Sequence, residues 1–165
     1  MVIAAPRSGT AWVSTWLTTD TTLCLHDPLT RWHYRALDGI QSEKTLGVSC
    51  TGLALFPSYV NAHPARKVIL HRDQAEIVAS IKRLGISGGY DVGALDRIKG
   101  KHVGWREIFD NPKPLYEFLT QKPFDADRHR ELLHMNVQRS IEGKWYDTRL
   151  MQALQEELRG AQPAH

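Results

Sequence analysis

The sequence predicts a three-layer α/β fold in which a central parallel sheet is flanked by helices. Short apolar runs typical of buried parallel strands, of which 2–5 and 66–71 are the clearest, are each followed by a polar turn and then by a helical pattern. The chain has 165 residues, which is enough for one domain with its own core rather than two. We therefore expect residues 1–165 to form a single domain.

Hydrophobic spacing and breaking residues set the elements of the first half. Trp12, Val13 and Trp16 give one inward-facing stripe to a helix that begins at Thr10. Pro28 breaks the strand that precedes it, and proline or glycine residues also mark ends of later segments. The expected strands are 2–5, 22–25, 44–49 and 66–71, and the expected helices are 10–19, 30–37, 53–60 and 73–84.

The second half is less regular. The glycine-rich stretch 85–90 is expected to be a turn that suits a lid over a ligand. The basic residues of 99–106 are expected to form a solvated surface, with a contact to a nucleotide or an acidic acceptor as the alternative. The expected helices are 112–119, 125–134 and 147–159, and a last strand is expected at 135–138.

The turn after the first strand has the chemistry of an anion-binding loop. It places an anion at the start of a helix, where the first backbone N–H groups lack partners and the helix dipole adds positive charge. Gly9 would let the backbone approach the anion closely. Arg7 would donate from a charged fork, and the hydroxyls of Ser8 and Thr10 could add hydrogen bonds.

The loop differs from that of the nucleoside triphosphatases. In the G-x-x-x-x-G-K-[ST] pattern, a lysine and a magnesium-binding hydroxyl follow the last glycine. Thr10 and Ala11 stand at these two places, so both side chains typical of Mg·ATP chemistry are missing. A nucleotide or small-molecule kinase is therefore the less favoured alternative.

Pro6-Arg7-Ser8-Gly9-Thr10-x-Trp12 resembles the 5′-phosphosulfate loop of the sulfotransferases, usually P-[KR]-S-G-T-T-W. The resemblance implies a P-loop-type fold and the cofactor 3′-phosphoadenosine 5′-phosphosulfate (PAPS), which leaves as 3′-phosphoadenosine 5′-phosphate (PAP). It also implies that Trp12 lies against the adenine. The residues implied for the 5′-phosphate and the sulfonate are Arg7, Ser8, Gly9, Thr10 and Ala11, the last of which replaces the family's second threonine and removes one hydroxyl.

A second pattern, Arg72-Asp73-x-x-x-x-Val78-x-Ser80, resembles the 3′-phosphate motif of the same family. Arg72 offers a planar two-pronged donor at the end of a strand, and Ser80 offers a hydroxyl on the following helix. The alternative is an ion-paired arginine and an ordinary helix-face serine. The arginine-lysine-glycine segment that completes this site in cytosolic members has no clear counterpart, and Lys144 is a weak substitute.

Transfer of a sulfonate to a hydroxyl or amine needs a group that takes the acceptor's proton. His26 and Asp27 follow the second strand, and ligands of open α/β sheets lie beyond the carboxyl ends of the strands. Tyrosylprotein and several bacterial sulfotransferases place a glutamate soon after the first helix. Asp27 lies at a similar distance and is the preferred base, with His26 second. The alternative is a turn in which Asp27 caps the next helix.

The histidine base of the cytosolic sulfotransferases is missing. In that family it lies in a K-T-H-L-P segment shortly before A-L-L-P, which Ala54-Leu55-Phe56-Pro57 resembles. Counting back places Cys50 at the histidine's position, where a thiol is expected to be a small core residue. The chain is therefore either an enzyme with another base or a catalytically inactive module that binds PAP or PAPS.

Composition and targeting signals limit the partners and the location. The net charge of +3 suits an anion ligand and is too small to indicate nucleic acid. Cys24 and Cys50 make no disulfide framework, and neither a membrane span nor a signal peptide is evident, so a cytoplasmic location is expected.

No metal site is expected, because His129 and His134 are wrongly spaced to share a metal ion. The acceptor would be a small molecule, a carbohydrate or a peptide, and a homodimer could complete the site.

Overall fold

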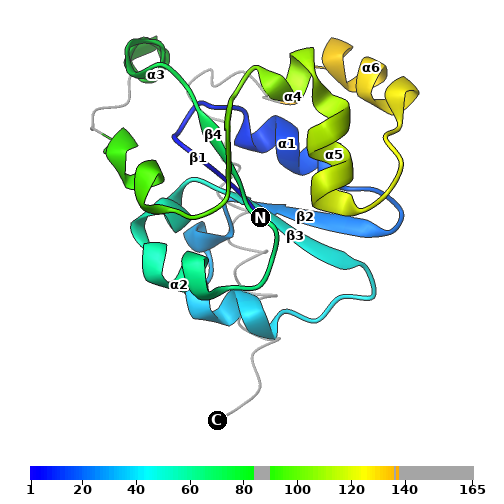
Figure 1. Cartoon of the computed structure of the whole chain (residues 1–165), viewed down its shortest axis with the longest axis horizontal. Coiled ribbons are helices and arrows are strands. Elements are labelled where there is room, and N and C mark those ends of the chain that lie inside the picture. The colour runs from blue at the N-terminus through cyan, green and yellow to red at the C-terminus, as the bar shows by residue number, and fades with distance from the viewer. Residues whose placement is uncertain (84–89, 136, 138–165) are drawn as a thin grey trace, which may run out of the picture.

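The computed structural model describes residues 1–83, 90–135 and 137. Within them, a five-stranded, all-parallel sheet has the order β2-β3-β1-β4-β5 and is flanked by helices (Figure 1). The strands are β1 (Val2–Ala4), β2 (Thr22–His26), β3 (Thr45–Cys50), β4 (Val68–His71) and β5 (Lys101–Gly104). The predicted α/β class with a central parallel sheet is therefore confirmed.

Two layers of helices cover the sheet. One face carries α1 (Thr10–Leu17), α4 (Glu107–Asp110), α5 (Pro112–Thr120) and α6 (Ala126–His134). The other carries α2 (Pro57–Ala62), α3 (Gln74–Arg83) and the 3-10 segments η2 (Tyr34–Gly39), η3 (Gly52–Leu55) and η4 (Val92–Arg97). A short 3-10 turn, η1 (Pro28–Thr30), follows β2.

The innermost strand, β1, is apolar throughout, as is typical of a strand whose two faces are both buried. In β1, Val2 and Ala4 belong to the core under α1, whereas Ile3 belongs to the core on the opposite face. Burial of a side chain such as that of Ile3 contributes about 1.5–3 kcal/mol to folding. The pairing register determines which residues lie side by side at the carboxyl ends of the strands. Ala4 lies opposite Leu70, and His26 lies opposite Ser49.

Two predicted helices are broken. The segment predicted as helix 53–60 forms η3 and then α2, because Pro57 lacks an N–H and opens a new helix at its first position. The segment predicted as helix 30–37 forms η2 after the separate turn η1. Both breaks lie just beyond the carboxyl ends of strands.

The strand β5 was not predicted. Its residues were expected to form only a solvated basic surface, and Lys101 and His102 are indeed exposed. β5 is an edge strand with polar side chains, which hinder pairing with another sheet edge. Because these side chains are polar, the sequence shows no apolar run that would predict a strand here. Residues 85–89 of the expected turn 85–90, residues 136 and 138 of the expected strand 135–138, and helix 147–159 with Lys144 lie outside the described residues.

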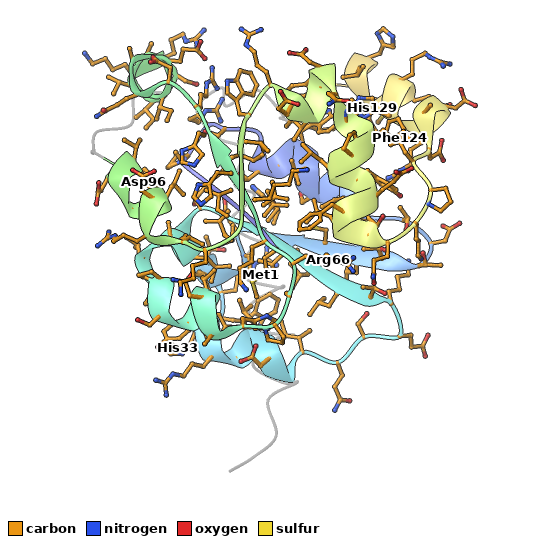
Figure 2. All side chains as sticks on the ribbon, in the orientation of Figure 1. Met1, His33, Arg66, Asp96, Phe124 and His129 are labelled. Atoms are coloured by element: carbon orange, nitrogen blue, oxygen red, sulfur yellow. The ribbon has the colours of Figure 1, made fainter. Side chains whose placement is uncertain are left out.

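An aromatic cluster joins α1 to α6 around a buried histidine. The ring of His129 lies 5.3 Å from those of Trp12 and Phe124 and 5.6 Å from that of Trp16. Figure 2 labels His129 and Phe124. His129 is 5% exposed, and neither ring nitrogen finds a hydrogen-bond partner in the described part of the chain. Burial therefore lowers the pKa of His129 below its ordinary value.

We expect this histidine to make the fold sensitive to acid. Below about pH 6.5, a histidine of the unfolded chain binds a proton that the buried ring resists. The free energy of unfolding should therefore fall with decreasing pH, by up to about 1.4 kcal/mol per pH unit from this group. Urea unfolding near pH 7.5 and pH 5.5 measures the loss. His129→Leu should reduce it, whereas exposed His134→Gln should not; equal acid sensitivity in all three proteins would contradict this prediction.

Candidate functional site

The connections of the sheet diverge beyond the carboxyl end of β1. The chain leaves β1 for α1 on one face, whereas its neighbours β3 and β4 lead into η3 and α3 on the other. In open α/β sheets, ligands bind where neighbouring connections diverge in this way. The loop 6–9 lies at this point, between β1 and α1.

The backbone of this loop is unusual. Arg7 has φ 67° and Gly9 has φ 85°, both in the left-handed region. A Cβ on Gly9 would also lie 3.0 Å from Cδ1 of Ile108. Arg7 and Asp27 are two of the three non-glycine residues with positive φ in the described ranges. Such strain concentrates at functional sites, and both residues are candidates from the sequence.

Ser8 is buried beside the start of α1 without a hydrogen bond. It is 0% exposed, and its Oγ has no partner among the described residues. An unpaired buried hydroxyl costs about 1–3 kcal/mol, so such groups need an explanation. Gly9 at the N-cap has no side chain that could cap the first N–H groups of α1. An orphaned hydroxyl next to uncapped amides fits an anion-binding loop.

The structure brings the two sequence motifs into direct contact. Nε of Arg7 donates to Oγ of Ser80 at 3.1 Å, and Nη1 of Arg72 donates to the carbonyl oxygen of Arg7. Burial, together with the nearby charges of Arg72 and Arg83, lowers the pKa of Arg7. Three guanidinium groups thus add positive charge around the loop, and the carboxylate of Glu76 offsets part of it, so the net charge there suits an anion.

Arg72 is held on three sides. Its Nε donates to Oε2 of Glu76 at 2.9 Å, one turn along α3, in addition to the bond from Nη1 to the loop. Its Cζ lies 4.3 Å from the ring centre of Trp105, in a cation–π contact. The side chain of Arg72 is 15% exposed. Trp105 was missed by sequence reasoning because it directly follows β5, the strand that had no apolar signal.

Trp12 does not fit its expected role. It was expected to lie against an adenine, but it is 7% exposed and packs against Trp16 and Phe109 at 5.4 and 5.0 Å between ring centres. Its Nε1 donates to the carbonyl oxygen of Leu132 at 3.3 Å. The structure therefore gives Trp12 a packing role between α1 and α6. A local motif does not reveal which face of a helix another layer will cover.

The two candidate bases lie together and touch the loop. Nε2 of His26 is 3.2 Å from Oδ2 of Asp27 and 3.2 Å from Oγ1 of Thr10. Oδ1 of Asp27 accepts hydrogen bonds from the backbone N and Oγ1 of Thr51, at 2.7 and 3.1 Å. Asp27 stands at the N-cap position of η1, yet its carboxylate bonds to Thr51 instead of capping that turn. The capping alternative is therefore not what fixes this side chain.

Cys50 and Tyr90 complete the surroundings of Asp27. Cys50 is fully buried, and mainly this burial raises the pKa of its thiol to about 11. It is a core residue, as expected, and is no substitute for a histidine base. The hydroxyl of Tyr90 donates to the carbonyl oxygen of Thr51 at 3.3 Å, and burial raises its pKa to about 12. Sequence reasoning did not single out Tyr90 because it lies in no motif.

Other binding features lie away from this edge or are absent from the described residues. A cavity of about 340 Å³ lies at the amino edge of the sheet, where Met1, Thr22 and Arg66 are among its lining residues (Figure 2 labels Met1 and Arg66). No described group of three or more histidine, cysteine, aspartate or glutamate side chains could hold a metal ion. Within the same ranges, every helix is too short or too polar to cross a membrane.

No protein-family model matches the sequence, and comparisons with curated proteins and with solved structures found no match. Function must therefore be inferred from the site itself, because an α/β architecture is shared by proteins of many activities.

Proposed function

We propose that this chain is a sulfotransferase of the P-loop type, which moves a sulfonate group from PAPS to a hydroxyl or amine acceptor. The observation that carries the proposal is the hydrogen bond from Arg7 to Ser80, supported by the bond from Arg72 to the loop. These bonds join the two halves of a nucleotide-binding pattern that lie 73 residues apart in the sequence. A single bisphosphorylated adenosine could contact both.

The loop would hold the 5′ end of the nucleotide. The uncapped amides of α1 and the orphaned hydroxyl of Ser8 are suited to hydrogen bonds with phosphate or sulfonate oxygens. Arg7 adds a charged donor beside them. Hydrogen-bond donors that are already oriented stabilise the negative charge that develops on the transferring group. In many enzymes this electrostatic stabilisation makes the largest contribution to the rate enhancement.

Arg72 and Ser80 would hold the 3′-phosphate. Arg72 is fixed by Glu76 and Trp105, and Ser80 faces the same region through its bond to Arg7. The arrangement would separate PAP from nucleotides without a 3′-phosphate, because only PAP can use this charge.

The geometry favours His26 over Asp27 as the proton acceptor. The close contact with the carboxylate of Asp27 stabilises the tautomer that carries a proton on Nε2, which leaves Nδ1 as the basic nitrogen. Nδ1 would take the proton of the acceptor while the acceptor's oxygen or nitrogen attacks the sulfur and the bond from sulfur to the 5′-phosphate oxygen breaks. Asp27, held by Thr51, would stabilise the resulting imidazolium.

Calorimetry with PAP, AMP and Mg·ATP, followed by transfer assays with labelled PAPS and a panel of phenols, sugars and peptides, tests the proposal. We expect PAP to bind at least about tenfold more tightly than AMP, since a charged hydrogen bond is worth about 1.5–3 kcal/mol. Preference for Mg·ATP would indicate a kinase. PAP binding without transfer to any acceptor would leave an inactive nucleotide-binding module, and failure to bind PAP would contradict both readings of the site.

A further inference from the structure

We propose that the carboxylate of Glu76 competes with the 3′-phosphate of the nucleotide for Arg72, and that this competition speeds release of the product PAP. The proposal rests on the proposed function, because it assigns Arg72 to the 3′-phosphate. It adds a residue that sets how tightly that subsite holds its ligand.

Two of the five N–H donors of Arg72 are already engaged, and one of them is Nε–H. A guanidinium binds phosphate best through two parallel N–H groups, and one such pair includes Nε–H. Oε2 of Glu76 takes this Nε–H at 2.9 Å, and the carbonyl oxygen of Arg7 takes a proton of Nη1. A phosphate can therefore form a full two-pronged contact on the Nε side only after Glu76 has left.

The surroundings make Glu76, rather than Arg72, the group that moves. The guanidinium lies 4.3 Å over the ring of Trp105 and also holds the loop, so its plane is restrained from two directions. Glu76 is 43% exposed, lies in the first turn of α3, and reaches Arg72 from one turn away. An exposed carboxylate can turn into water at small cost.

Charge gives the competition its direction. A phosphate monoester carries a charge of about −1.5 to −2 near neutral pH, so it should displace a carboxylate from the same donor. The displaced Glu76 would stay near the bound phosphate and repel it. Glu76 would thus lower the affinity for PAP, and product release limits the turnover of many enzymes that bind their ligands tightly.

The test is Glu76→Gln, which keeps the shape of the side chain and removes its charge. We expect PAP to bind about 2–5-fold more tightly and to dissociate more slowly by a similar factor, while the affinity for AMP stays unchanged. Glu43→Gln, an exposed substitution in the loop before β3, changes the net charge equally and should leave the affinity for PAP unchanged. Calorimetry gives the affinities, and stopped-flow displacement gives the dissociation rate.

The outcomes separate this proposal from the proposed function. If wild-type protein prefers PAP to AMP but Glu76→Gln binds PAP with equal or lower affinity, Glu76 merely supports Arg72 and the competition is wrong. If wild-type protein shows no preference for PAP, the 3′-phosphate subsite is wrong, and the proposed function and this inference both fail.

Discussion

Replacing His26 by asparagine should lower kcat for sulfonate transfer about 10²–10⁴-fold, the range that a positioned general base contributes. The affinity for PAP should change far less than kcat, because His26 touches the nucleotide motifs only at Oγ1 of Thr10. Steady-state transfer from labelled PAPS measures kcat, and calorimetry with PAP measures the affinity.

Two further variants distinguish the roles within this pair. Asp27→Asn should also lower kcat, because the imidazolium that forms on His26 loses its anionic neighbour. The exposed His134→Asn should behave like wild-type protein. Full activity in His26→Asn together with loss of activity in Asp27→Asn would identify Asp27 as the base and contradict the assignment made from the hydrogen bonds.

Replacing Arg72 by methionine should weaken PAP binding about 10–150-fold, which corresponds to the loss of a charged hydrogen bond. Methionine retains an apolar stem that can pack against Trp105, so the loss should come mainly from the missing charge. Binding of AMP should weaken much less, because AMP has no 3′-phosphate. Calorimetry with the two nucleotides gives both values.

Arg130→Met, which removes an exposed arginine of α6, provides the matched control. It should bind PAP as wild-type protein does. Thermal unfolding of Arg72→Met shows whether the loop that Arg72 holds is still folded. Equal weakening of PAP and AMP in a well-folded Arg72→Met variant would mean that Arg72 shapes the loop and does not bind the 3′-phosphate.

The sequence predicted the elements whose side chains are buried on both faces. The runs at β1 and β4 are continuous and apolar, and each leads into a helix, so their order and the position of the loop could be read directly. Edge strand β5 could not be recognised, because Lys101 and His102 face solvent. The 3-10 segments after β2 and β3 were predicted as helices, since short apolar patterns do not separate the two.

The sequence motifs named most residues of the candidate site but gave only part of the contacts between them. The motifs located Arg7, Ser8 and Arg72, but the burial of Ser8 and the bond from Arg7 to Ser80 depend on how distant segments meet. The packing of Trp12 against Trp16 and Phe109 could not be read from the motif for the same reason. The choice between His26 and Asp27 as the proposed base depends on the contacts of Asp27 with His26 and with Thr51, and no sequence pattern singled out Thr51.

The pairing of the strands has a consequence for variants far from the ligand. His26 reaches Thr10 only because β2 and β3 are aligned so that His26 lies opposite Ser49, whose Oγ donates to the carbonyl oxygen of Thr10 at 3.0 Å. Successive side chains of a strand point to opposite faces, so a shift of one residue would turn His26 away from the loop. If the proposed function holds, the position of His26 beside the loop is set by the interior of the sheet, and substitutions there should lower sulfonate transfer while the protein still folds.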